Sequence, residues 1–209
     1  SGMRKGVVIH IDDTVRSIQA AVEEAQMMAG VDIGSVYAGI AGGHIRSLNS
    51  EGMVPIQTGQ VGQRDLDRVL DTAQTLPIPA DREIIHVLPQ SFVVDDQPGV
   101  KNPIGMSGVR LEADVHMVTG AVTSAQNICK SIRRAGVEVV DLVLEPLASS
   151  YTVLSPEEEE MGVVLVDVGG GTTEIAVISL NGIGTIETIR IAGDEQTKAI
   201  VDWFKDQHK

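Results

Sequence analysis

The residues best placed to do chemistry lie in one short segment, GVVLVDVGGGTTEIAVISL at 162–180. An apolar strand runs into Asp167, and a second apolar strand begins at Ile175. Between the strands stand three glycines and two hydroxyl residues: Gly169, Gly170, Gly171, Thr172 and Thr173. Glycines allow consecutive backbone N–H groups to face one anion, because no Cβ blocks the approach. The pattern therefore predicts a β-hairpin whose turn binds phosphate.

The residues on either side of the glycines fit the same chemistry. Asp167, at the end of the first strand, is suited to hold hydrated Mg²⁺ opposite the phosphates, because Mg²⁺ keeps most of its waters in protein sites. Thr172 and Thr173 add hydroxyl donors. The segment is not a Walker loop, since neither Gly-Lys-Ser/Thr nor a helix follows the glycines. A purely structural alternative stays open, in which the turn needs glycine only for positive φ, but three glycines between an aspartate and a threonine pair favour the phosphate loop.

Composition limits the classes of partner. The chain has 209 residues, with 16 basic and 29 acidic side chains and a net charge of −13. Such an acidic surface repels nucleic-acid backbones, and an aromatic content of 2% leaves few platforms for base stacking. We therefore expect no nucleic-acid partner. The single cysteine permits no internal disulfide, and no signal peptide or membrane-spanning run is recognisable, so we expect a cytoplasmic protein.

The elements that must position the hairpin follow from hydrophobic periodicity. Apolar stripes predict helices over 12–30, 66–73 and 121–135 and a short helix from Glu145, and apolar or alternating runs predict strands over 31–41, 83–94, 109–118 and 137–144. The strand–helix alternation after residue 120 predicts an α/β sheet covered on both faces. Residues 45–118 follow the order strand, helix, strand, strand, which predicts a small α+β module inserted into the α/β domain.

The alternating strand at 109–118 predicts the packing of that module. Its apolar positions are Val109, Leu111, Ala113, Val115 and Met117, and its polar positions are Arg110, Glu112, Asp114 and His116. We expect the apolar face to pack on helix 66–73 and the polar face to point outward. The loop at 95–108, rich in glycine and proline, is expected to be exposed and available for contact with another protein.

Two further patterns predict packing rather than chemistry. Cys129 lies on the apolar face of helix 121–135, which predicts an inert core thiol. An apolar stripe formed by Ala199, Ile200, Trp203 and Phe204 predicts a C-terminal helix docked on the second sheet. A membrane-surface helix is the less favoured alternative, because this segment is short and acidic rather than basic.

Several stretches carry a resemblance to a known family. The glycine-rich hairpin is similar to the second phosphate loop of the actin, heat-shock chaperone and sugar kinase ATPases. Beyond it, the chain resembles the FtsA family of bacterial cell division proteins over nearly its whole length. The matching stretches are GMRKGVV (2–8), SVYAGIAGGHI (35–45), HVLPQSFVVDDQPGVKNPIGMSGVRLEADVHMVTG (86–120) and LEPLASSYTVL (144–154).

The resemblance implies an actin-like, ribonuclease H-like α/β fold in three parts. Residues 1–46 and 119–154 match subdomain IA, which lacks its first hairpin here. Residues 47–118 match an inserted α+β, SHS2-like subdomain called IC, and residues 155–209 match part of subdomain IIA. The tail at 189–209 is more similar to the rod-shape protein MreB than to typical FtsA.

The resemblance also implies a cofactor and roles for the candidate residues. The cofactor is ATP with Mg²⁺. Asp167 would face Mg²⁺ through water, Thr172 and Thr173 would flank the phosphates, and Glu145 would lie near the attacking water. The residues that would bind the β- and γ-phosphates are Gly169, Gly170 and Gly171.

The implied biology is that of a division protein. The resemblance implies a cytoplasmic protein at the inner membrane of the division site, which tethers FtsZ filaments to the membrane and recruits other division proteins. It also implies self-association through subdomain IC. Membrane contact would come only from a C-terminal amphipathic helix that this chain does not include.

The family pattern extends beyond this chain at both ends, so we expect an internal piece of a longer protein. For such a piece we expect ATP affinity no better than the millimolar range, about −4 kcal/mol, and at most slow ATP hydrolysis by the full-length protein. Two alternatives stay open: a non-catalytic interaction module, and a pilus-assembly actin-like relative that shares the insertion. The run at 103–120 speaks against the second alternative.

Overall fold

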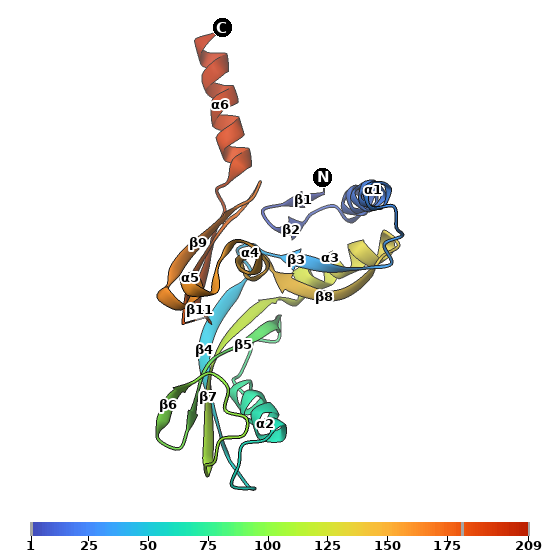
Figure 1. Cartoon of the computed structure of the whole chain (residues 1–209). Coiled ribbons are helices and arrows are strands. Elements are labelled where there is room, and N and C mark those ends of the chain that lie inside the picture. Colours follow the sequence, from blue (N-terminus) through green and yellow to red (C-terminus); the bar gives the residue numbers. More distant parts are fainter. Residues whose placement is uncertain (1, 181, 209) are drawn as a thin grey trace.

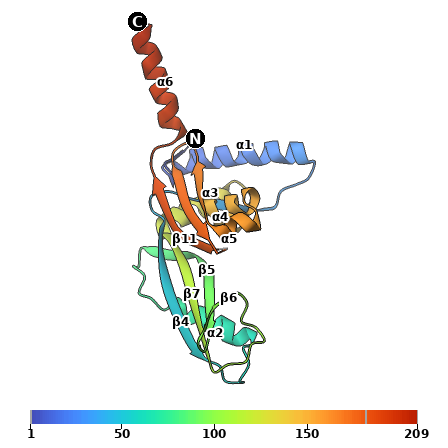
Figure 2. The ribbon, with the colours of Figure 1, turned by 60° about the vertical axis from the view of Figure 1, so that its left-hand side comes forward.

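The computed structural model describes residues 2–180 and 182–208 and shows three units in an elongated arrangement (Figure 1). The chain begins in a central α/β unit, leaves it for a four-stranded sheet at one end, and returns to the centre. It finishes in a three-stranded sheet and a helix that points away from the other units (Figures 1 and 2). This order agrees with a module inserted into an α/β domain.

The central unit is built on two parallel strands, which pair in the sheet order β3–β8. A two-residue-per-strand hairpin precedes the first helix, and helices α3 and α4 both contact the parallel pair. The elements are β1 (Met3–Arg4), β2 (Val7–Val8), α1 (Ile11–Ala29), β3 (Ser35–Ile40), α3 (Val122–Arg134), β8 (Glu138–Leu144) and α4 (Glu145–Val153). The carboxyl ends of β3 and β8 lie side by side, so the residues that follow both strands share one edge of the unit.

The inserted unit is an antiparallel sheet in the order β4–β7–β5–β6, with one helix on one face. Its elements are β4 (Arg46–Pro55), α2 (Gln63–Ala73), β5 (Arg82–Val94), β6 (Gln97–Val100) and β7 (Arg110–Ala121). The predicted contact between helix α2 and the apolar face of β7 is present, because Val69 and Leu111 are buried in one core. Gly52 allows the helix to approach closely, since a Cβ there would lie 2.2 Å from the carbonyl oxygen of Val69.

Two expectations for the strand at 109–118 are wrong. Val109 lies outside β7 and is 71% exposed, whereas His116 does not point outward but is 2% exposed. His116 lies on the same face as Val118, and that end of β7 is covered by β11 of the third unit. Its Nδ1 lies 2.6 Å from the Oδ1 atom of Asn49 on β4. Part of the loop predicted at 95–108 also forms a strand, β6, which pairs with β5.

The third unit is an antiparallel sheet in the order β11–β10–β9. Its elements are α5 (Pro156–Met161), β9 (Val163–Val168), β10 (Thr173–Ser179), β11 (Gly182–Ile189) and α6 (Gly193–Gln207). One face of the sheet contributes Ala176 and Ile178 to the core shared with the central unit. Among the described residues no helix is both long and apolar enough to cross a membrane.

The predicted docking of the C-terminal helix on the second sheet is wrong. Helix α6 extends away from the sheet (Figures 1 and 2), and Ile200, Trp203 and Phe204 are 68%, 62% and 57% exposed. The cause lies in its first turn, where the N–H groups of Gly193 and Asp194 donate to carbonyl oxygens of the glycine-rich loop. These bonds fix the start of α6 at the end of the hairpin, so its axis continues beyond the sheet.

Candidate functional site

The glycine-rich segment forms a tight connection between β9 and β10. Val168 pairs with Thr173, and the N–H group of Gly169 donates to the carbonyl oxygen of Thr172 at 2.9 Å. Gly169, Gly170 and Gly171 all have φ outside the left-handed region. The structural alternative, in which the turn needs glycine for positive φ, is therefore contradicted. The glycines serve close approach instead, since a Cβ at Gly171 would lie 3.1 Å from the backbone nitrogen of Lys5.

Backbone carbonyl groups of the loop are hydrogen-bonded, whereas two of its N–H groups are not hydrogen-bonded among the described residues. The carbonyl oxygens of Gly169 and Gly170 accept hydrogen bonds from the first turn of α6, at 3.1 Å from Gly193 and 2.8 Å from Asp194. Within the described part of the chain, the N–H groups of Gly170 and Gly171 have no hydrogen-bond acceptor. These two donors therefore remain available to an anion, as a phosphate loop requires.

Two carboxylates predicted from the sequence converge beside this loop. Asp167 lies near the end of β9, and its Oδ2 accepts a hydrogen bond of 2.7 Å from the hydroxyl of Ser149 on α4. Glu145, the first residue of α4, follows β8 directly, and Gly39 on β3 leaves room for its side chain. Burial, followed by the nearby charges of Glu174 and Asp167, raises the pKa of Glu145.

A third carboxylate, Glu174, was missed from the sequence. It lies opposite Asp167 in the β9–β10 register and is 2% exposed. Burial is the largest cause that raises its pKa, while hydrogen bonds from Thr172 and from the backbone of Gly42 act in the opposite direction. Its Oε1 atom is buried without a hydrogen-bond partner in the described structure. The available signal was a charged residue at the start of an otherwise apolar strand, which a surface position would explain equally well.

The two threonines are placed differently from the expectation. The hydroxyl of Thr173 donates to the carbonyl oxygen of Ile191 at 2.7 Å, and the side chain of Thr172 lies close enough to Glu174 to lower the pKa of that carboxyl. Both residues are buried. Their hydroxyls therefore fix the loop and the buried carboxylate, and the donors left for a ligand are backbone N–H groups. Ser149, which sequence reasoning also missed, is the hydroxyl residue that contacts Asp167.

The residues present fit a phosphate group with a hydrated divalent cation. Two N–H groups of the loop have no acceptor in the described structure, and a carboxylate hydrogen-bonded by Ser149 lies near the strand end. Hydrated Mg²⁺ needs only one or two carboxylates in addition to phosphate oxygens. The site also lies at the carboxyl ends of parallel strands β3 and β8, where α/β folds usually bind ligands.

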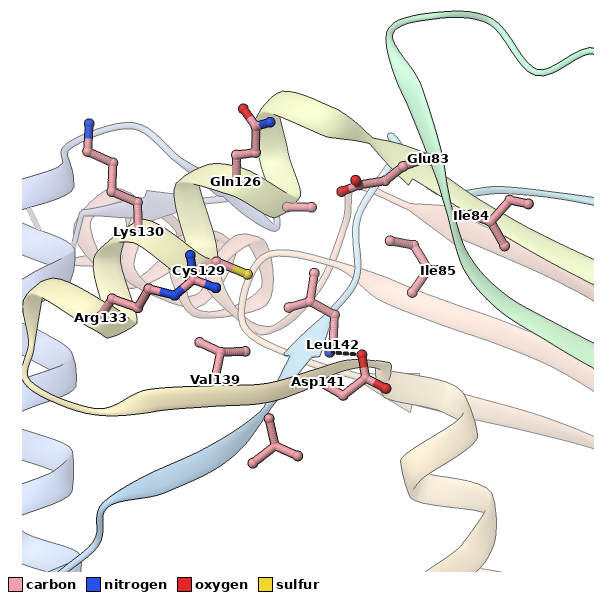
Figure 3. Close-up of a pocket in the computed structure, with 12 residues that line it drawn as sticks. Glu83, Ile84, Ile85, Gln126, Cys129, Lys130, Arg133, Val139, Asp141 and Leu142 are labelled. Carbon is pink, nitrogen blue, oxygen red and sulfur yellow. Dashed lines mark hydrogen bonds between the residues drawn. The ribbon is translucent and has the colours of Figure 1, made fainter.

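A second candidate surface is a groove of about 560 Å³ at the junction of the central and inserted units (Figure 3). Helix α3 forms one side with Gln126, Cys129, Lys130 and Arg133, and β8 and the start of β5 form the others. Strand β8 pairs with β3 alone among the described strands. At its end the N–H group of Leu144 donates to Nε2 of His86 on β5 at 3.0 Å, so its other edge is open only before that residue. Cys129 is only half-buried and lines this groove, so the expectation of a core thiol is wrong.

Comparison with solved structures defines the fold. The chain superposes on the PilM–PilN type IV pilus biogenesis complex with a TM-score of 0.66 at 15% identity, covering 98% of this chain and 56% of that chain. It superposes on the ethanolamine utilization protein EutJ from Carboxydothermus hydrogenoformans with a TM-score of 0.51 at 16% identity, covering 98% and 46%. At these identities the similarity concerns the fold alone. The fold is actin-like with an inserted SHS2 domain.

Sequence comparison defines the family. Residues 42–119 match the model of the SHS2 domain inserted in FtsA, and residues 116–209 match the MreB/Mbl protein model. Cell division protein FtsA of Pseudomonas aeruginosa is 55% identical over 95% of this chain and 48% of its own length. FtsA of Escherichia coli K12 is 41% identical over 97% and 48%. The chain belongs to the FtsA family of cell division proteins, and it spans about half the length of the curated relatives it matches.

Proposed function

We propose that the full-length protein binds ATP with Mg²⁺ at this site and acts as an actin-like scaffold of cell division. One observation carries the proposal: the loop that keeps the N–H groups of Gly170 and Gly171 unengaged lies next to Asp167 and Glu145. The four groups come from β9, α4 and the loop between β9 and β10. Their convergence is what a phosphate with a hydrated cation needs.

Each of these residues has a separate role in the proposed nucleotide binding. The N–H groups of Gly170 and Gly171 donate to phosphate oxygens, and the glycines keep side chains out of the way. Asp167, oriented by Ser149, accepts hydrogen bonds from water on the cation. When bound, Mg²⁺ neutralises part of the phosphate charge. Glu145, enclosed beside Gly39, would orient a water molecule toward the terminal phosphate.

The test compares ATP binding by the full-length protein and by its Asp167→Ala variant. We expect the variant to bind ATP at least tenfold more weakly in the presence of Mg²⁺, roughly 1.4 kcal/mol, with little difference in EDTA. The exposed Asp71→Ala change on α2 is the matched control and should leave affinity unchanged. Equal affinity of Asp167→Ala and wild type, with unchanged circular dichroism, would show that the loop does not bind Mg²⁺–ATP.

In the cell, the proposed role is that of a filament tether. The FtsA family assignment supports FtsZ and other division proteins as partners, with self-association through the inserted unit and a place at the cytoplasmic face of the inner membrane. The acidic balance of the chain supports protein rather than nucleic-acid partners.

A specific feature supports recruitment of partners as a second function. The open edge of β8 borders the groove lined by α3, and an extended segment of a division protein would fit there by strand addition. Lys130 and Arg133 on one side and Glu83 and Asp141 on the others supply charges of both signs. This function requires no nucleotide, so it also accommodates the adaptor alternative.

Cys129 offers a direct test of the groove, since it is the only cysteine of the chain. In a full-length protein without other reactive cysteines, a bound cytoplasmic segment of a division protein should slow maleimide labelling of Cys129. ATP should not slow it, because the residues that line the groove include neither the loop at 169–172 nor any residue of α4. Labelling at the same rate with and without a partner that demonstrably binds would place the partner elsewhere.

A further inference from the structure

The turn between β1 and β2 is seated directly against the glycine-rich loop. Lys5 and Gly6 have φ of 51° and 76°, as two-residue hairpin turns require. On one side, a Cβ at Gly171 would lie 3.1 Å from the backbone nitrogen of Lys5. On the other side, a Cβ at Gly6 would lie 2.6 Å from the carbonyl oxygen of Ala41, just after β3. The turn therefore fills the space between the central unit and the loop of the third unit.

The side chain of Lys5 extends this contact to the start of α6. Its Nζ donates to the carbonyl oxygen of Arg190 at 2.9 Å and lies 3.0 Å from the Oε1 atom of Glu195. Glu195 also accepts a hydrogen bond from the N–H group of Ala192 and so caps the helix. The hydrogen bond from Lys5 lowers the pKa of Glu195. Both side chains of the pair are about one-third exposed, at 33% and 37%, so the ion pair is weak and readily exchanged.

The surroundings of Lys5 favour an anion. A pocket of about 430 Å³ is bounded by the β1–β2 turn, Gly171 and the first turns of α6, including Lys198. Arg4 and Lys198 line it and form no ion pair within the described part of the chain. Three cationic side chains and two acidic ones, Asp194 and Glu195, line this pocket, which gives it a net positive charge in a chain whose net charge is −13. One of the cationic residues already touches the loop through its own backbone.

We propose that Lys5 is a ligand of the terminal phosphate of ATP and distinguishes ATP from ADP. This inference rests on the proposed nucleotide site. The lysine stem is flexible, so its ammonium exchanges the carboxylate of Glu195 for phosphate oxygens held by the N–H groups of Gly170 and Gly171. With ADP, the terminal phosphate is absent and Lys5 stays on Glu195. The exchange connects the phosphate state to the first turn of α6, because Glu195 caps that helix.

The experiment measures the affinities of the full-length protein for Mg²⁺–ATP and Mg²⁺–ADP by calorimetry. Lys5→Ala should weaken ATP binding about tenfold and change ADP binding less than twofold. Lys5→Arg should restore most of the preference for ATP, and Glu195→Gln should strengthen ATP binding a few-fold, because it frees the ammonium. The exposed Lys101→Ala change, in the inserted unit, is the matched control and should change neither affinity.

Different outcomes separate this inference from the function on which it rests. If the wild-type protein binds neither nucleotide, the proposed nucleotide site and the role of Lys5 both fail. If the wild-type protein binds both but Lys5→Ala weakens them equally, Lys5 only supports the loop and the inference is overturned. An unchanged ratio of the two affinities in Lys5→Ala overturns it as well. Circular dichroism and thermal unfolding of each variant show that the fold is retained.

Discussion

Asp167 and Glu174 show how strongly the surroundings of a single residue decide its chemistry. The two carboxylates are direct neighbours across the β9–β10 ladder. Asp167 accepts a hydroxyl hydrogen bond from Ser149, whereas Glu174 is 2% exposed and one of its oxygens has no partner in the described structure. Burial therefore raises the pKa of Glu174. Burial also raises the pKa of Glu145, so desolvation disfavours the ionised form of both glutamates.

The buried carboxylate gives a stability prediction that depends on pH. Because its pKa is higher in the folded than in the unfolded chain, folding favours the protonated form, and its contribution to stability falls as pH rises above the ordinary value of 4.5. We expect Glu174→Gln, which carries no charge, to unfold at a higher temperature than wild type at pH 8, with a gain of about 1–3 kcal/mol. Near pH 4 the difference should disappear.

The measurement is thermal unfolding by circular dichroism over a series of pH values. Glu138→Gln, at an exposed position of β8, is the control and should show no such dependence. A constant difference between Glu174→Gln and wild type at every pH would mean that the carboxylate is not held in its neutral form by burial.

Among the elements, β7 combines a packing face with a charged one. Leu111, Ala113 and Val115 are buried against α2. On the opposite face, Glu112 pairs with Arg110 at 2.8 Å, and Asp114 accepts a hydrogen bond of 2.7 Å from Ser91. These charged residues are half-buried, while His116 further along the same face is covered by β11. The open part of this face is therefore limited to the half of β7 that lies away from the other units.

This surface gives a prediction for assembly. In the full-length protein, Glu112→Lys combined with Asp114→Lys should impair self-association or recruitment of a division partner, because both charges on an accessible face are reversed. ATP binding should survive, since the loop at 169–172 lies in another unit. Sedimentation and partner pull-down measure the effect. Unchanged behaviour in both assays would direct the search to the neighbouring segment at 95–108.

At the scale of the whole chain, two apolar surfaces of the third unit are exposed in the part that the structure describes. One is the sheet face that carries Val164, Val166 and Val168, and the other is the stripe on α6 that includes Trp203. Helix α6 is hydrogen-bonded to the glycine-rich loop at its first turn and extends away from this sheet (Figure 1). The cores of the molecule are formed elsewhere, one within the inserted unit and one shared by the central and third units.

Trp203 is the only tryptophan of the chain, so its fluorescence reports on α6 directly. At 62% exposure, we expect iodide to quench its emission in the folded protein nearly as strongly as in the unfolded protein. The comparison uses this chain of 209 residues with and without guanidinium chloride. Strong protection from quenching in the folded state would show that α6 is covered in solution, either by its own sheet or by a second molecule.

The sequence by itself determined the kinds of element, the inserted α+β module and the glycine-rich hairpin that follows Asp167. These features depend on periodicity and on glycine spacing, which act between residues close together in the chain. Only the tertiary structure decided that His116 is buried, that α6 leaves its sheet, and that Glu174 and Lys5 border the loop. Each of these depends on contacts between distant segments: β7 with β11, α6 with the loop at 169–170, and the β1–β2 turn with Gly171. Local sequence patterns do not predict such contacts, because a charged residue beside a strand gives the same pattern whether another unit or solvent covers it.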